Sequence, residues 1–114
     1  MGAEQQAWWF LAGAIVFELA GTLSMKMAHG FSQFWPSVLI FVCYGLSMTS
    51  LTFALRGIEL GMAYAIWAGL GTSLVAVVGI LFFHESASPV KLACVLLIVV
   101  GVAGLKWVDS QGAA

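Results

Sequence analysis

Residues 7–26 read AWWFLAGAIVFELAGTLSMK, and this stretch decides the fold. Between Ala7 and Met25 it contains a single ionisable side chain, that of Glu18. An apolar run of roughly 20 residues is long enough to cross the hydrocarbon core of a bilayer as a helix. Because lipid offers the backbone no hydrogen-bond partner, such a run must satisfy its own N–H and C=O groups. The stretch therefore predicts a transmembrane helix with a carboxyl group near its middle.

Three further apolar runs follow, so the predicted transmembrane helices occupy about residues 7–26, 36–56, 60–83 and 90–107. The 114-residue chain is 62% hydrophobic and 8% charged, whereas a soluble domain carries about 25% charged residues. Lipid must therefore be its main solvent. We expect an all-α integral membrane protein with one transmembrane domain, residues 1–114, and four membrane-spanning helices.

Composition and spacing argue against several other classes of protein. A formal net charge of −1 provides no basic patch for nucleic acid. Cys43 and Cys94 lie inside apolar runs, so we expect no disulfide. His29 and His84 have no second ligand at metal spacing, and no nucleophile stands beside a base, so we expect no metal site, no organic cofactor and no enzyme. The N-terminal segment lacks a typical cleavage site, which argues against a removable signal peptide.

The positive charges are balanced between the two sides of the membrane. Four crossings put Arg56 and Lys106 on the side of the termini, and Lys26 and Lys91 on the other side. Since the positive-inside rule then gives no preferred orientation, we expect insertion in both orientations and pairing with an inverted copy. The antiparallel homodimer would have a central binding site. In the alternative interpretation, an inserting partner or the histidines fix one orientation.

Glu18 is the candidate for the chemistry of the chain, because the other charged residues lie at span ends, in loops or in tails. An ionised side chain at such depth costs at least roughly 2.5 kcal/mol on insertion scales. We expect the carboxyl group to be protonated, paired with a cation or placed in a water-filled cavity. By releasing its proton, the group could then bind a cation. The alternative is a neutral acid that hydrogen-bonds to another helix and serves only assembly.

Small and aromatic residues are expected to line a substrate pocket around Glu18. Helical spacing places small side chains on its own face, and aromatic faces on other spans attract organic cations by roughly 0.5 to 2 kcal/mol. The alternative is that small residues only let helices pack closely and that the aromatic rings are packing residues. The predicted pocket residues are Leu11, Ala14, Gly21, Thr22, Tyr44, Ser47, Met48, Tyr64 and Trp67.

Two further sets of small residues predict motion and assembly. Gly69 and Gly71 interrupt the third span, where glycine lowers the cost of bending, so we expect a hinge there. Cys94 and Gly101 belong to a stripe of small residues along the fourth span, which contains no interior charge. That stripe is typical of a helix that packs against another copy.

The sequence resembles the small multidrug resistance family of bacterial proton-coupled exporters over nearly its whole length. The resemblance rests on FELAGTLSMK at residues 17–26, on GF at 30–31 with WPS at 35–37, and on GMAYAIWAGLG at 61–71. It implies an antiparallel homodimer in the bacterial cytoplasmic membrane, in which the two Glu18 carboxylates bind either protons or substrate. The proton is then the coupling ion. The implied helpers are Tyr44, Tyr64 and Trp67.

Within the family that the sequence resembles, the residue at position 21 differs between exporters of different substrates. Guanidinium exporters of this family typically carry Trp where this chain has Gly21, so the sequence favours the branch that exports lipophilic or quaternary ammonium cations. Met48 departs from that branch, which often has an aromatic residue there. The alternatives are a guanidinium or polyamine exporter of the same family and, in a different class, a non-transporting membrane assembly subunit.

Overall fold

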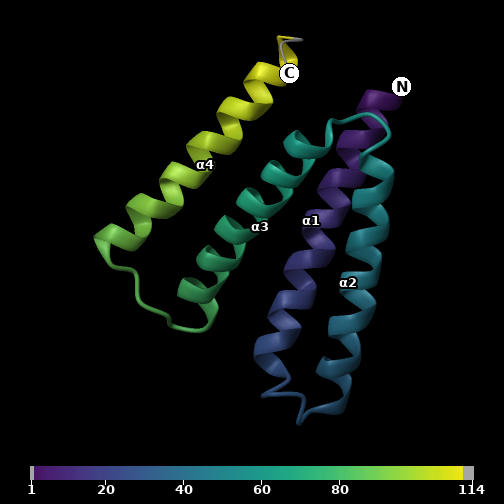
Figure 1. Cartoon of the computed structure of the whole chain (residues 1–114). Coiled ribbons are helices and arrows are strands. Elements are labelled where there is room, and N and C mark those ends of the chain that lie inside the picture. The colour runs from purple at the N-terminus through teal and green to yellow at the C-terminus, as the bar shows by residue number, and fades with distance from the viewer. Residues whose placement is uncertain (1, 112–114) are drawn as a thin grey trace.

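The computed structural model describes residues 2–111 and folds them into four α-helices joined by short loops (Figure 1). The helices are α1 (Ala3–Met27), α2 (Phe34–Ala54), α3 (Leu60–Phe82) and α4 (Pro89–Ser110). Each is long and apolar enough to cross a membrane. The predicted all-α architecture with four membrane-spanning helices is confirmed, and no strand occurs within the described range.

The helix bounds differ from the apolar runs mainly where polar residues extend a helix. α1 begins at Ala3 rather than at Ala7, because the polar residues before Ala7 continue the same backbone hydrogen bonds. α2 begins at Phe34, so Pro36 lies inside its first turn, where a missing N–H breaks no helical bond. α4 begins at Pro89, and the Ser88 hydroxyl accepts a hydrogen bond of 3.2 Å from the Lys91 N–H as an N-cap.

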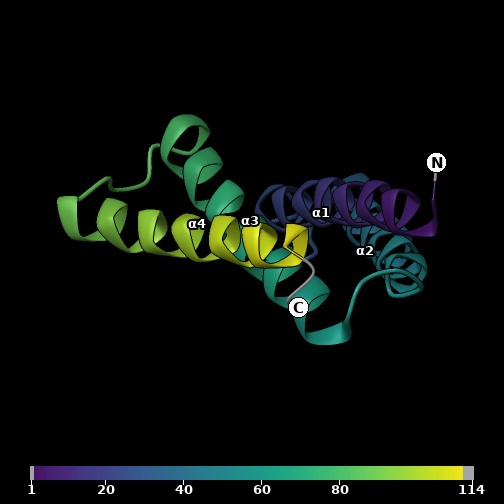
Figure 2. The ribbon, with the colours of Figure 1, turned by 90° about the horizontal axis from the view of Figure 1, so that it is seen from above.

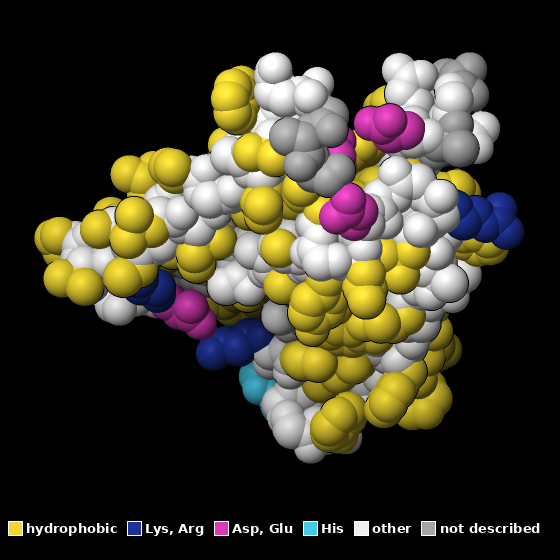
Figure 3. All heavy atoms as spheres, turned by 45° about the horizontal axis from the view of Figure 1, so that its top comes forward, with side chains coloured by type: hydrophobic (Ala, Val, Ile, Leu, Met, Phe, Trp, Pro, Cys, Tyr) yellow, Lys and Arg dark blue, Asp and Glu magenta, His cyan; other side chains and the backbone are white. Residues whose placement is uncertain are grey.

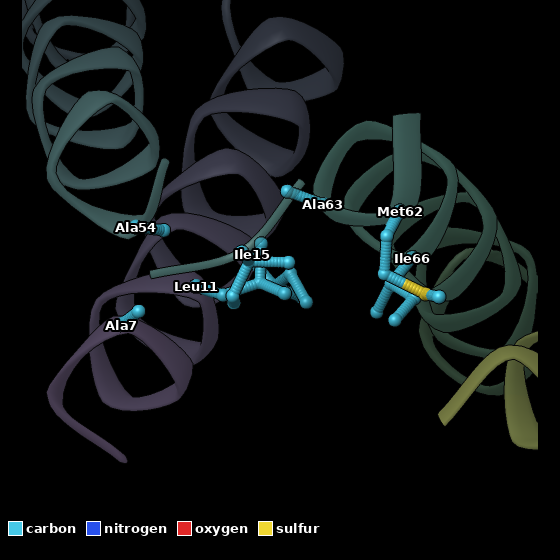
Figure 4. Packing of buried hydrophobic residues seen from close by; sticks show 8 residues of the cluster. Ala7, Leu11, Ile15, Ala54, Met62, Ala63 and Ile66 are labelled. Atoms are coloured by element: carbon cyan, nitrogen blue, oxygen red, sulfur yellow. The ribbon is translucent and has the colours of Figure 1, made fainter. Parts of the chain in front are cut away.

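α1 is the central helix of the packing. It runs antiparallel along α2 and also contacts α3 (Figures 1 and 2). The buried cluster lies near the end of the molecule that holds both termini, where side chains from these three helices meet (Figure 4). Its members are Ala7, Leu11 and Ile15 of α1, Ala54 at the end of α2, Ile58 of the following loop, and Met62, Ala63 and Ile66 of α3.

α4 stands apart from α1 and α2 and packs chiefly on α3 (Figures 1 and 2). None of its described residues is buried, although the helix is strongly apolar. In water such a surface would be costly, but in a bilayer the lipid tails are as apolar as the side chains. α4 therefore presents most of its surface to lipid or to another membrane helix.

Candidate functional site

Glu18 lies in the middle of α1, on the side that faces α3. A Cβ atom built at Gly71 of α3 would lie only 2.7 Å from Glu18 Oε2, so the glycine makes room for the carboxyl group. The Thr22 hydroxyl donates a hydrogen bond of 3.3 Å to Glu18 Oε1. Within the described part of the chain, Oε2 is buried and has no hydrogen-bond partner. One oxygen of the carboxyl group is thus hydrogen-bonded, and the other is packed against Gly71 without a hydrogen-bond partner.

Thr22 connects Glu18 to the second helix. Its hydroxyl lies within hydrogen-bond distance of the Tyr44 hydroxyl, at 2.5 Å, in addition to its bond to Glu18. Thr22 follows Glu18 by one helical turn, so both side chains lie on the same face of α1. Glu18, Thr22 and Tyr44 form a polar chain between α1 and α2, and the sequence placed all three in the predicted pocket.

Gly21 is packed against the aromatic ring of Tyr44. A Cβ atom built at Gly21 would lie 2.9 Å from Cδ2 and Cε2 of that ring, and 3.3 Å from the Cβ atom of Cys43. We expected Gly21 to leave space for a ligand, but in the single chain the Tyr44 ring occupies that space. The physical reason is that the absence of a side chain at Gly21 lets the two helices approach closely.

Three other predicted pocket residues are enclosed by helix packing in the single chain. Ser47 is fully buried, and its hydroxyl donates a hydrogen bond of 2.7 Å to the backbone carbonyl of Ala14, which is also fully buried. Leu11 belongs to the buried cluster. These side chains stabilise the contacts of α1, and their part in lining a substrate pocket stays a prediction.

The remaining aromatic residues of the predicted pocket lie on α3, where Tyr64 is exposed and Trp67 packs against the buried cluster. The rings of Tyr64 and Trp67 are 5.3 Å apart between centroids, and 55% of Tyr64 is exposed. The Trp67 indole N–H is buried without a hydrogen-bond partner among the described residues. Met48 of α2 is also exposed. The single chain does not close these three residues around Glu18, so their role in the pocket also stays a prediction.

The two predicted hinge glycines lie within a continuous helix, since α3 runs unbroken from Leu60 to Phe82. They face different neighbours. A Cβ atom built at Gly69 would lie 2.9 Å from Cγ2 of Val102 on α4, whereas Gly71 faces Glu18 on α1. Both glycines allow close approach of a neighbour to α3. Sequence reasoning named Gly71 only as a hinge and missed its contact with the carboxyl group, because the sequence does not show which residue of α3 lies opposite Glu18.

The predicted interface residues of α4 lie at the surface of the single chain. Cys94 and Gly101 are both exposed, and nothing lies within 4 Å of a Cβ atom built at Gly101. Among the described residues, no group of three or more His, Cys, Asp and Glu side chains is arranged to hold a metal ion.

Comparison with known proteins shows which family model and which relatives the chain matches. Residues 6–98 match the family model described as Small Multidrug Resistance protein. The chain is 45% identical over 102 residues to the "Uncharacterized membrane protein YvaE" of Bacillus subtilis, an alignment that covers 90% of this chain and 86% of the relative. It is 39% identical over 100 residues to the "Guanidinium exporter" of Escherichia coli K12, and 40% identical to that of Salmonella typhimurium. Both of these alignments cover 88% of this chain and 95% of the relative.

Proposed function

Because this chain belongs to the Small Multidrug Resistance family of membrane exporters, we propose that it is a proton-coupled antiporter for lipophilic or quaternary ammonium cations. Its four apolar helices and its bacterial relatives make it a multi-pass protein of the bacterial inner membrane. Members of the family are transporters rather than enzymes. We propose the coupling ion, the class of substrate and the oligomeric state.

The observation that carries the proposal is the Glu18 carboxyl group, with one oxygen bonded to Thr22 and the other buried and free. A buried carboxylate without a countercharge is costly, so the group must hold a proton or a cation. Since one group cannot hold both, binding of one releases the other. Protons that flow in through this site can then drive a cation out.

We propose that the working unit is an antiparallel homodimer. The unburied surface of α4, with Cys94 and Gly101 exposed, supports a contact with a second copy. The two positive residues on each side of the membrane support insertion in both orientations. In such a dimer the exposed Tyr64 and Met48 would be available to complete a pocket around the two Glu18 side chains.

The choice of substrate rests on position 21. A tryptophan at this position, as guanidinium exporters typically carry, would require the Tyr44 ring to move, because even a Cβ atom at Gly21 approaches that ring to 2.9 Å. This packing supports the lipophilic or quaternary ammonium branch. Guanidinium is the second candidate, because relatives of 39% and 40% identity bear the name "Guanidinium exporter".

The test is uptake into proteoliposomes with an acidic interior, in which outward flow of protons should drive uptake of tetraphenylphosphonium. Glu18→Gln should reduce uptake to that of protein-free liposomes, because the amide neither releases a proton nor balances a cation. Glu4→Gln is the matched control, since Glu4 is an exposed carboxylate at the start of the same helix. Unchanged uptake by Glu18→Gln would reject the mechanism.

The same liposomes separate the alternatives. Uptake of guanidinium or of spermidine, without uptake of tetraphenylphosphonium, would assign the chain to one of the other branches of the family. If the wild-type protein carries none of the three cations, the non-transporting assembly subunit becomes the better interpretation.

A further inference from the structure

A cavity of about 370 Å³ opens between the C-terminal ends of α1 and α3. These two helices diverge toward the end of the molecule opposite the termini (Figure 1). Thr22 and Val75 line the inner part of the cavity, and Lys26, Phe83 and Glu85 line its outer part. Since Thr22 is hydrogen-bonded to Glu18, the cavity extends from the membrane face to the side chain next to the central carboxyl group.

The backbone fixes Glu85 at the mouth of this cavity. His84 adopts a left-handed conformation with φ of 56°, which turns the chain back toward α3. The Glu85 N–H then donates a hydrogen bond of 3.1 Å to the Gly79 carbonyl. The Glu85 carboxylate lies directly against Gly79, where a Cβ atom would overlap it. Gly79 therefore makes room for the carboxylate at the C-terminal end of α3.

The ammonium group of Lys26 lies near the Glu85 carboxylate and the Phe83 ring at the mouth of the cavity. Its ammonium nitrogen lies 4.0 Å from Glu85 Oε2 and 5.9 Å from the centre of the Phe83 ring. A carboxylate and an aromatic face are the two features that recognise an organic cation. The lysine and glutamate side chains are 61% and 44% exposed, so their pairing is worth only about 0 to 1 kcal/mol. A soluble cation can therefore compete with the lysine.

Lys26 and Phe83 also border a second hollow, of about 550 Å³, which is lined by His29 and Gly30 on its outer side. These two side chains and Met25 line both spaces, so the hollow adjoins the cavity that Thr22 lines. Figure 3 shows basic, acidic and histidine side chains close together in a recess between hydrophobic regions, while other charged side chains lie elsewhere on this face.

We propose that Glu85 and Phe83 form a peripheral site for organic cations, and that Lys26 occupies this site until an arriving or departing cation replaces it. The ligand is a hydrophobic cation with one positive charge, which pairs with the carboxylate and packs on the ring. The inference deepens the proposed function, because such a site serves a transporter of cations. Its own binding step does not require Glu18.

The experiment measures equilibrium binding of radiolabelled tetraphenylphosphonium to the full-length protein in phosphatidylcholine liposomes. All variants carry Glu18→Gln, which removes the central countercharge. In this background Lys26→Gln should strengthen the remaining saturable binding by up to about fivefold, the upper limit of the contribution of an exposed ion pair. Glu85→Gln should weaken it by at least as much, and Phe83→Leu should weaken it without a change of charge.

The opposite signs separate a binding site from a structural ion pair. If Lys26 and Glu85 only stabilise the fold, either substitution breaks the same pair, and both should change binding in the same direction. Glu59→Gln controls for general attraction of cations, since it removes an exposed charge in the loop before α3. Equal effects of Glu59→Gln and Glu85→Gln would overturn the proposal.

Absence of saturable binding in the Lys26→Gln variant of this background would also overturn it. The proposed function has a separate readout, namely proton-driven uptake by protein that retains Glu18. Uptake without peripheral binding would reject the peripheral site alone. Peripheral binding without uptake would reject the antiport mechanism alone.

Discussion

Gly21 of α1 packs against the Tyr44 ring of α2, so a larger residue at position 21 would displace that ring. Gly21→Ala should push the Tyr44 ring away and weaken the chain of hydroxyl groups that ends at Glu18, because the new Cβ atom would lie 2.9 Å from the ring. Loss of one hydrogen bond corresponds to about 1 kcal/mol, or about fivefold weaker binding of tetraphenylphosphonium. Isothermal titration calorimetry measures this change.

Gly13→Ala is the matched control on the same helix, since a Cβ atom there meets Ser50 Oγ only at 3.8 Å, an ordinary contact. Its binding should equal that of the wild-type protein. If Gly13→Ala and Gly21→Ala weaken binding equally, the effect comes from general loosening of α1 and α2 rather than from the Tyr44 ring.

At the scale of single residues, the sequence predicts which side chain carries the chemistry but not the geometry around it. Glu18 was identified because a lone acid within an apolar run is costly, and that argument requires no structure. Thr22 was placed beside it by helical spacing. The free Oε2 atom and the contact with Gly71 depend on how α3 crosses α1, which no local pattern specifies.

At the scale of elements, α3 contacts both α1 and α4, and its two glycines should have separable effects. Gly71→Ala should displace the Glu18 carboxyl group, since a Cβ atom would lie 2.7 Å from Oε2, and should lower cation binding. Gly69→Ala should leave binding intact but lower the thermal stability, because its Cβ atom would meet Val102 of α4 at 2.9 Å. Binding titration and thermal unfolding in the same detergent measure the two effects.

Gly45→Ala provides the reference for both, because Gly45 lies inside α2 and, among the described residues outside that helix's own backbone, nothing lies within 4 Å of a Cβ atom there. Replacing glycine by alanine inside a helix should by itself stabilise by about 0.5 to 1 kcal/mol. If Gly69→Ala lowers the thermal stability, the close contact with Val102 therefore costs more than this gain. If all three variants unfold at the same temperature, the close contact of α3 with α4 contributes nothing measurable.

The four helices could be predicted because lipid imposes a minimum length of apolar chain on every crossing. Their contacts could not, because lipid removes the difference between a buried and an exposed apolar face. In a soluble helix the polar stripe marks the outer side. α4 has no charged residue between Leu92 and Leu105, yet none of its described residues is buried, so periodicity gives no information about its neighbours. Likewise, Lys26 and Glu85 lie far apart in the sequence and meet only through the crossing of α1 and α3.

At the scale of the whole molecule, the single chain leaves α4 without a partner on most of its surface. Gly101→Leu should block the proposed contact with a second copy while leaving the chain itself folded, because no described residue outside the local helix backbone lies within 4 Å of a Cβ atom built there. Native mass spectrometry from detergent should detect monomer where the wild-type protein gives dimer, and uptake of tetraphenylphosphonium should fall to background.

Gly45→Leu is the control for added bulk, since Gly45 of α2 is equally open and lies outside the proposed interface. It should stay dimeric and active. A dimer of unchanged stability in Gly101→Leu would place the contact between copies elsewhere on the surface.

The central claim is that a proton and an organic cation exclude each other at Glu18, and proton release on binding tests it most directly. Tetraphenylphosphonium is added to the purified protein in weakly buffered detergent, and the released protons are followed with a pH indicator at several starting pH values. We predict release that accompanies binding, a lower affinity at lower pH, and no release from Glu18→Gln. Cation binding without proton release, or equal release from Glu18→Gln, would contradict the account.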